Sequence, residues 1–129
     1  MKIAVLIART LLGLLFLVFG LNGFFHFIPM PPPTGLAGQY MGALFVSHYL
    51  VVVFLLQVVG GALLLANRYV PLGLLLLGPV LVNILLFHIA FYPAGLPLPL
   101  FLAVLEILLV YAYRASFAGI FAAKAEPVL

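Results

Sequence analysis

The sequence predicts an all-α fold: a polytopic membrane protein whose four transmembrane helices form one compact bundle with both termini in the cytoplasm. Composition predicts the membrane, because 68% of the 129 residues are hydrophobic and only 5% are charged, whereas a soluble domain carries about a quarter charged residues. Length predicts the span count, because four runs of about 20 apolar residues, each sufficient to cross a bilayer, nearly exhaust the chain. We therefore expect one domain over residues 1–129 and no separate soluble catalytic domain.

Breaks in the apolar pattern divide the chain into its expected spans. Residues 29–33 contain four prolines and residues 93–99 contain three, and neither stretch can sustain a helix. Asn67 begins a tight turn that places Pro71 in the first turn of the next helix. The first span is an uncleaved helix and not a signal peptide, because no A-x-A-like cleavage site follows it. The expected spans are residues 3–25, 42–66, 70–92 and 98–114.

The basic residues predict the orientation of the bundle. With four spans, every Lys and Arg falls on one side of the membrane: Lys2, Arg9, Arg68, Arg114 and Lys124. The two connecting segments on the other side, residues 26–41 and 93–97, contain none. Cytoplasmic segments carry the excess of positive charge, so we expect the bacterial cytoplasmic (inner) membrane with both ends inside. Five dispersed cations form no patch for nucleic acid.

Small and basic residues share one face of the first span. Arg9, Gly13 and Gly20 lie on that face, and Gly61 lies one turn beyond Gln57 on the second span. Small residues allow membrane helices to approach closely, so these glycines are expected at helix contacts. Arg9 itself is expected at the cytoplasmic boundary, where its long side chain can extend into the interface.

Polar side chains at membrane depth are costly and are therefore the first functional candidates. The candidate catalytic residues are Glu106, Asn83 and His88, and the candidate cofactor-binding residues are His26, His48, His88 and Gln57. Glu106 is the one carboxyl group expected inside the bundle. It is either a proton carrier or hydrogen-bonding group for a quinone-like head, or a neutral acid that bonds Asn83 or Tyr113 and joins two helices.

The three histidines are expected in the outer third of the bundle, where imidazoles could ligate a metal or haem. None is spaced three or four residues from another ligand, so no metal site is predicted, and a role at the membrane interface is the alternative. The absence of cysteine removes thiolate ligands and nucleophiles. Most tyrosines lie near the predicted span ends and are expected to form interfacial belts.

Three stretches resemble the DoxX family of small membrane proteins over about residues 8–120. They are RTLLGLLF with FGLNG (residues 9–16 and 19–23), LQVVGGALLL with NRYVPL (residues 56–65 and 67–72), and NILLFH (residues 83–88). The resemblance implies four transmembrane helices and a link to sulfur, redox or stress metabolism, since the namesake is a subunit of a thiosulfate:quinone oxidoreductase. Many members carry Glu where this chain has Gln57, and often Lys near Asn22 or Gly23.

The expected function is that of an accessory or structural subunit of a larger membrane redox or energy-converting complex, without catalytic activity of its own. Its polar residues diverge around the helices, so some should face other membrane subunits or a bound quinone, pigment or lipid. The alternative is a quinone-interacting oxidoreductase component that uses Glu106, Asn83 and His88. A small transporter is less favoured, because the sequence contains no inverted repeat and no ring of charges.

Overall fold

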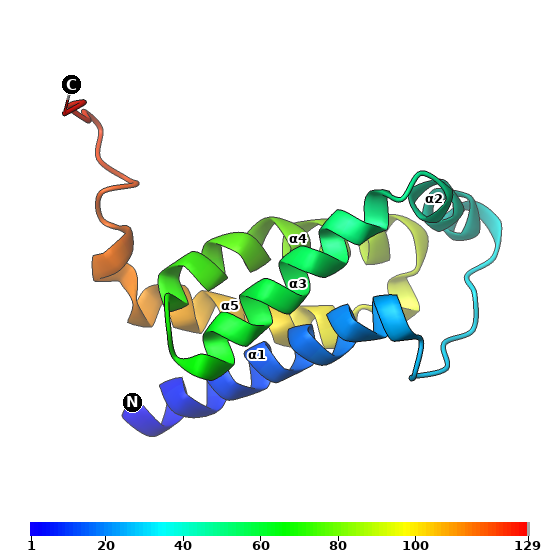
Figure 1. Ribbon diagram of the computed structural model, residues 1–129, viewed down its shortest axis with the longest axis horizontal. Coiled ribbons are helices and arrows are strands. Elements are labelled where there is room, and N and C mark those ends of the chain that lie inside the picture. Colours follow the sequence, from blue (N-terminus) through cyan, green and yellow to red (C-terminus); the bar gives the residue numbers. More distant parts are fainter. Residues whose placement is uncertain (129) are drawn as a thin grey trace.

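The computed structural model describes residues 1–128, and these residues form helices and connecting segments without a β-strand. The helices are α1 (Lys2–Phe25), α2 (Gly35–Val46), α3 (Tyr49–Ala66), α4 (Val70–Phe91) and α5 (Pro97–Ala112), with short 3-10 turns η1 (Pro93–Gly95) and η2 (Arg114–Phe117) (Figure 1). Helices α1, α3 and α4 are long and apolar enough to cross a membrane, and α5, with 16 residues, is shorter. The predicted class, an all-helical membrane protein, is confirmed.

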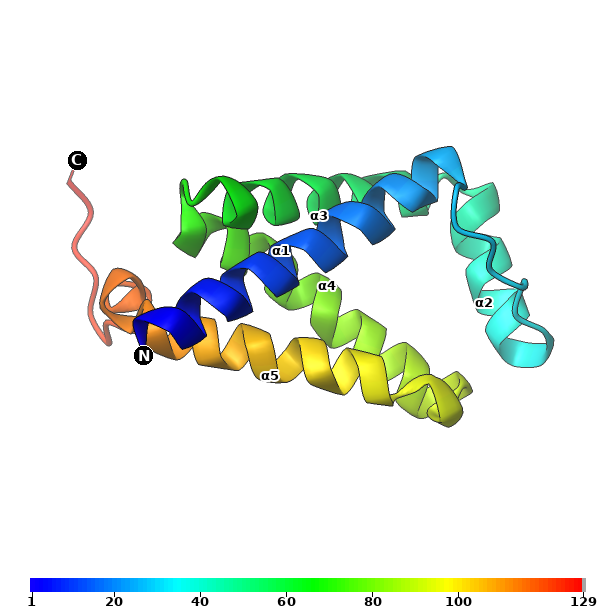
Figure 2. The same ribbon diagram turned by 90° about the horizontal axis from the view of Figure 1, so that it is seen from below.

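Four helices pack around a shared core: α3 packs along both α1 and α4, and α5 closes the other side against the same two helices. Both termini and the α3–α4 turn lie at one end of the bundle, and α2 lies across the opposite end (Figure 1). Figure 2 shows α1 and α5 close together near the N-terminus and diverging toward the end that carries α2. The fully buried leucines of the core come from four helices: Leu12, Leu64, Leu74, Leu77 and Leu109.

Two adjacent glycines bring α3 into contact with both of its neighbours. A Cβ on Gly61 would lie 2.6 Å from the carbonyl oxygen of Gly13 in α1, and a Cβ on Gly60 would lie 2.6 Å from Leu77 Cγ in α4. Both distances are too short for a real side chain. The predicted close contact of Gly13 and Gly61 is therefore confirmed, and only the absence of side chains allows it.

Arg9 was predicted to extend into the membrane interface, and in the structure it does not. Its side chain is only 9% exposed and donates a hydrogen bond from Nη1 to the carbonyl oxygen of Leu64. Leu64 lies in the last turn of α3, where the helix dipole favours a cation, and its carbonyl oxygen also accepts from the Asn67 N–H (3.3 Å). The face that Arg9 shares with Gly13 packs against α3, so the guanidinium meets the Leu64 carbonyl and not solvent.

The predicted second span, residues 42–66, is two helices and not one. Helix α2 begins at Gly35, directly after the prolines, and α3 begins at Tyr49 after a break at Ser47 and His48. His48 adopts a left-handed conformation with φ 63°. The Ser47 hydroxyl donates to the carbonyl of Leu44 (3.2 Å) and accepts from the Tyr49 N–H (3.3 Å). Such local bonds compete with the helical pattern, and they allow α2 to turn away from α3.

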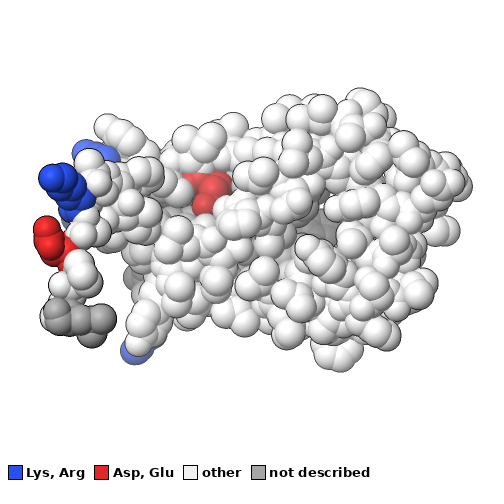
Figure 3. Space-filling model, turned by 90° about the horizontal axis from the view of Figure 1, so that it is seen from above, with Lys and Arg blue, Asp and Glu red and all other residues white. Residues whose placement is uncertain are grey.

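Charged side chains gather at the end of the molecule where the termini lie, and the rest of the visible face is uncharged except for one acidic group between the helices (Figure 3). The chain contains only two acidic residues, and Glu126 belongs to the C-terminal segment after η2. The acidic group within the bundle is therefore Glu106, which is 8% exposed.

Candidate functional site

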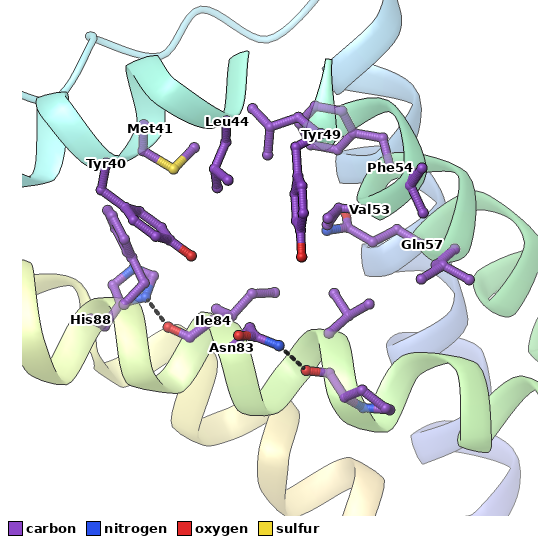
Figure 4. A pocket seen from close by; sticks show the side chains of 16 residues that line it. Tyr40, Met41, Leu44, Tyr49, Val53, Phe54, Gln57, Asn83, Ile84 and His88 are labelled. Atoms are coloured by element: carbon purple, nitrogen blue, oxygen red, sulfur yellow. Dashed lines mark hydrogen bonds between the residues drawn. The ribbon is translucent and has the colours of Figure 1, made fainter. Parts of the chain in front are cut away.

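A cavity of about 510 Å³ lies between α2, α3 and α4. Most of its wall is aliphatic or aromatic, with five polar side chains placed around it: Tyr40, Tyr49, Gln57, Asn83 and His88. Figure 4 shows the hydroxyl groups of Tyr40 and Tyr49 directed into the cavity from the side of α2 and α3, opposite Asn83 and His88 on α4. An apolar wall with a few convergent polar groups is the usual form of a small-molecule site.

The α4 side of the cavity presents hydrogen-bonding atoms that the helix has already oriented. His88 Nδ1 lies 2.8 Å from the carbonyl oxygen of Ile84. A carbonyl oxygen only accepts, so Nδ1 carries the hydrogen and Nε2 of the neutral ring is an acceptor. Asn83 Nδ2 donates to the carbonyl of Pro79 (2.9 Å), which leaves the second amide hydrogen and Oδ1 for another partner.

Gln57 is the most informative polar residue of the cavity. Its side chain is 6% exposed, and within residues 1–128 it makes no hydrogen bond to another side chain or to the backbone. Its amide atoms are not among the fully buried atoms that lack a partner, so the amide is accessible and free to form hydrogen bonds. The amide borders the cavity, so a bound molecule could supply the missing partner.

A second cavity, of about 590 Å³, adjoins the first in the half of the bundle that carries α2. It is lined by residues of all five α-helices and of the segment after α1, and its polar side chains are Asn22, His26, Gln57 and His88. The two cavities share six lining residues: Met41, Leu50, Phe54, Gln57, Ile84 and His88. Gln57 and His88 therefore border both the first cavity, called the lateral cavity below, and the second.

Aromatic contacts hold α2 against α4 at the edge of the lateral cavity. The ring of Tyr40 lies 5.8 Å from Phe87 and 5.3 Å from Phe91, and Phe87 meets His88 edge-on at 5.2 Å. Such ring pairs contribute about 0.5–1.5 kcal/mol each beyond their buried area. They fix the position of Tyr40 and cover one side of the His88 ring.

The predicted histidines separate into two kinds. His26 and His48 are exposed residues with φ 52° and φ 63°, at the end of α1 and the start of α3. His26 lines only the second cavity, and His48 lines neither. His88 is the histidine that the structure places with Gln57 and Asn83. Within residues 1–128, no three His, Asp or Glu side chains are close enough together to hold a metal ion.

Glu106 lies apart from the other predicted residues and lines neither cavity. It faces α4 at Gly78, where a Cβ would lie 3.8 Å from Glu106 Oε2. Of the two alternatives for Glu106, the one in which it bonds Asn83 or Tyr113 is wrong: Asn83 donates to Pro79, and within residues 1–128 Glu106 Oε1 is buried without a hydrogen-bond partner. The predicted set of Glu106, Asn83 and His88 is therefore not one site.

Sequence reasoning missed Tyr40 and Tyr49, which were assigned to the interfacial belts. Both rings are partly exposed, at 38% and 62%, as belt residues would be. Their role depends on the turn at Ser47 and His48, which folds α2 back over α4. The local signal was a Thr34-Gly35 pair at the start of an apolar run, directly after the prolines, where a helix can begin.

The fold and the cavity define a class: a small helical membrane protein with a lateral, mainly apolar cavity bordered by amide, imidazole and phenol groups. Comparison with protein-family models, with curated proteins and with solved structures found no match to this chain.

Proposed function

We propose that this chain is a DoxX-type accessory subunit of a larger membrane redox or energy-converting complex in the bacterial inner membrane, where it holds a quinone-like molecule. The observation that carries the proposal is the position of Gln57, whose amide borders two adjoining cavities and makes no hydrogen bond within residues 1–128. A molecule with a polar ring and a long apolar tail would satisfy this amide and fill both apolar spaces.

The hydrogen-bonding groups fit both redox states of a quinone. Quinone carbonyls accept hydrogen bonds, and the hydroxyls of Tyr40 and Tyr49 and the amides of Gln57 and Asn83 can donate them. The hydroxyl groups of the reduced quinol donate, and His88 Nε2 is an available acceptor on α4. The remaining wall is apolar enough to accompany an isoprenoid tail.

The proposal of an accessory role is supported by the redox groups that the chain can offer to a quinone. The chain has no cysteine, so it offers no dithiol to exchange electrons with a quinone. Electrons would therefore come from a partner subunit, and this chain would bind and orient the molecule that receives them.

The proposed topology has four spans with both termini cytoplasmic. Sixteen residues of α5 rise about 24 Å, somewhat less than the roughly 30 Å of the hydrocarbon core, and the η2 turn continues the chain toward the charged end. That end carries the termini, the α3–α4 turn and the Lys and Arg side chains shown in blue in Figure 3. A cytoplasmic surface is expected to carry such basic groups.

The test is purification from native membranes into lipid nanodiscs, followed by native electrophoresis and mass spectrometry of the lipid extract. We expect partner subunits to co-migrate and about one quinone per chain to be extracted. Tyr40→Phe and Tyr49→Phe each remove one hydroxyl group from the cavity and should lower the quinone content about fivefold to tenfold, the equivalent of one hydrogen bond.

Tyr69→Phe is the matched control, because Tyr69 lies in the α3–α4 turn at the opposite end of the bundle and lines neither cavity. Its quinone content should equal that of the parent chain. Quinone that is absent from the parent extract, or equal in all three variants, would contradict the binding role. A chain that migrates alone would contradict the accessory role.

A second candidate, a quinone-interacting oxidoreductase component, is favoured by one observation. The bond from His88 Nδ1 to Ile84 fixes the ring and leaves Nε2 able to accept a proton from a quinol hydroxyl. In the purified complex, His88→Phe would then abolish quinone-linked turnover while the binding of other subunits is unchanged. Turnover at the parent rate would exclude this role.

A further inference from the structure

We propose that Glu106 is the docking point for a transmembrane helix of a partner subunit, and that this helix carries a Lys or Arg that bonds the carboxyl group. The inference rests on the proposed accessory function and names the chemistry of the partner. It concerns the α4–α5 side of the bundle, away from both cavities.

The first observation is a carboxyl group without a partner. Glu106 is 8% exposed, and its Oε1 is buried without a hydrogen bond in the described chain. Buried acids in membrane helices pair with other polar groups, since an isolated one is costly in hydrocarbon. The described basic residues offer no such pair, because Arg9 bonds Leu64 and Arg114 bonds the carbonyl of Tyr111.

The second observation is that part of Glu106 is visible at the surface of the bundle, although its Oε1 is buried. Figure 3 shows it between the helices on an otherwise uncharged face. The residue of α4 that faces Glu106 is Gly78, which has no side chain to cover the carboxyl group. A Cβ added to Gly78 would lie 3.8 Å from Glu106 Oε2. The exposed residues one turn to either side of Gly78 on α4 are Leu75 and Val82, at 48% and 55%.

A carboxyl group between the helices, with exposed apolar side chains beside it, fits a partner helix that has one basic residue among apolar ones. Glu106 lies about two turns from the C-terminal end of α5, the end that carries the charges. Lys and Arg concentrate on the cytoplasmic side of membrane proteins and have long side chains that extend along apolar surface. A basic residue near the cytoplasmic end of the partner helix could therefore reach the carboxyl group.

The first experiment compares Glu106→Leu and Glu106→Gln with the parent chain in native membranes and in isolation. If Glu106 is a docking point, Glu106→Leu should lower the fraction of chain in the large complex at least tenfold, and Glu106→Gln should lower it less, because the amide still accepts a hydrogen bond. The isolated chain should melt at the parent temperature or above, since replacing an unpaired buried polar group by an apolar one is neutral or stabilising.

The results separate the two proposals. If the parent chain assembles and both variants assemble equally well, Glu106 is not the docking point and the accessory function stands. If Glu106→Leu lowers the melting temperature of the isolated chain, the carboxyl group is an internal structural link and the inference is wrong. If the parent chain migrates alone, both proposals fail.

The second experiment identifies the molecule that binds beside Glu106. A photo-reactive amino acid at Leu75 should cross-link to a transmembrane segment that contains a Lys or Arg, and one at Leu55, exposed on α3, should not. A cross-link only to lipid, to a second copy of this chain, or to a segment without a basic residue would overturn the proposal.

Discussion

Gly61→Ala tests the packing that holds the bundle together. The added Cβ would lie 2.6 Å from the carbonyl oxygen of Gly13 and 2.6 Å from the backbone N of Leu17. Both atoms belong to the backbone of α1, so no side chain can rotate away. Ordinary contact begins at 3.4 Å, and the two helices must therefore separate locally by about 0.8 Å.

The expected loss of stability follows from that displacement. A gap of 0.5–1 Å removes about a quarter to a half of the dispersion energy of each affected contact, and overpacked sites typically lose about 1–3 kcal/mol. For a chain of this length, about 1 kcal/mol corresponds to roughly 4 °C in melting temperature. We therefore expect Gly61→Ala to melt roughly 4–12 °C below the parent chain.

The assay uses the absence of cysteine from the native chain. Ala8→Cys, at a position that is 3% exposed in α1, provides one buried thiol whose reaction with a dye in detergent reports unfolding. Gly42→Ala is the matched control, since nothing lies within 4 Å of its added Cβ, and it should melt at or slightly above the parent temperature. If Gly61→Ala also melts within about 1 °C of the parent, the close approach of α1 and α3 is not what the structure describes.

Two further predictions concern the charged end and the topology. Arg9→Met removes the hydrogen bond to Leu64 and should lower the free energy of unfolding by about 1.5–3 kcal/mol, the usual contribution of a hydrogen bond to a charged group. The same thiol assay measures this loss, and the control Lys2→Met, on the exposed first turn of α1, should change the melting temperature little. Equal melting temperatures of the two variants would show that the fold does not need the buried guanidinium. With four spans, a membrane-impermeant maleimide should label Thr34→Cys in intact spheroplasts and Ala125→Cys only after lysis; labelling of both from the same side would require an odd number of spans.

The ends of most helices could be predicted because particular residues cannot continue a helix. The prolines after α1 and α4 remove backbone donors, and Asn67 ends α3 in a left-handed conformation with φ 54°. The break at Ser47 and His48 could not be predicted, because neither residue type forbids a helix. It depends on the two hydrogen bonds of the Ser47 hydroxyl, which form only in the folded chain.

The candidate site was predictable in its residue types and not in its grouping. Gln57 is buried as a residue within the bundle should be, whereas Asn83 is exposed, and depth along a helix does not say which residues meet across helices. Glu106 lies at a similar depth to Asn83, yet it faces Gly78 on the other side of α4. The grouping depends on the rotation of each helix about its axis, which the glycine contacts set and a single sequence reveals only in part.

The arrangement of α1 explains why the second cavity lies in the half of the bundle that carries α2. Along α3, α1 stays in close contact: an added Cβ would lie 2.9 Å from the Gly61 carbonyl oxygen at Gly13 and 3.0 Å from the backbone N of Val58 at Gly20. One turn farther, at Gly23, the space between the two helices is filled by the ring of Phe54, which lines both cavities. Helices α1 and α5, by contrast, diverge toward the end that carries α2 (Figure 2), and residues of both helices line the second cavity. The space of this cavity therefore arises between α1 and α5, while the contact of α1 with α3 is kept.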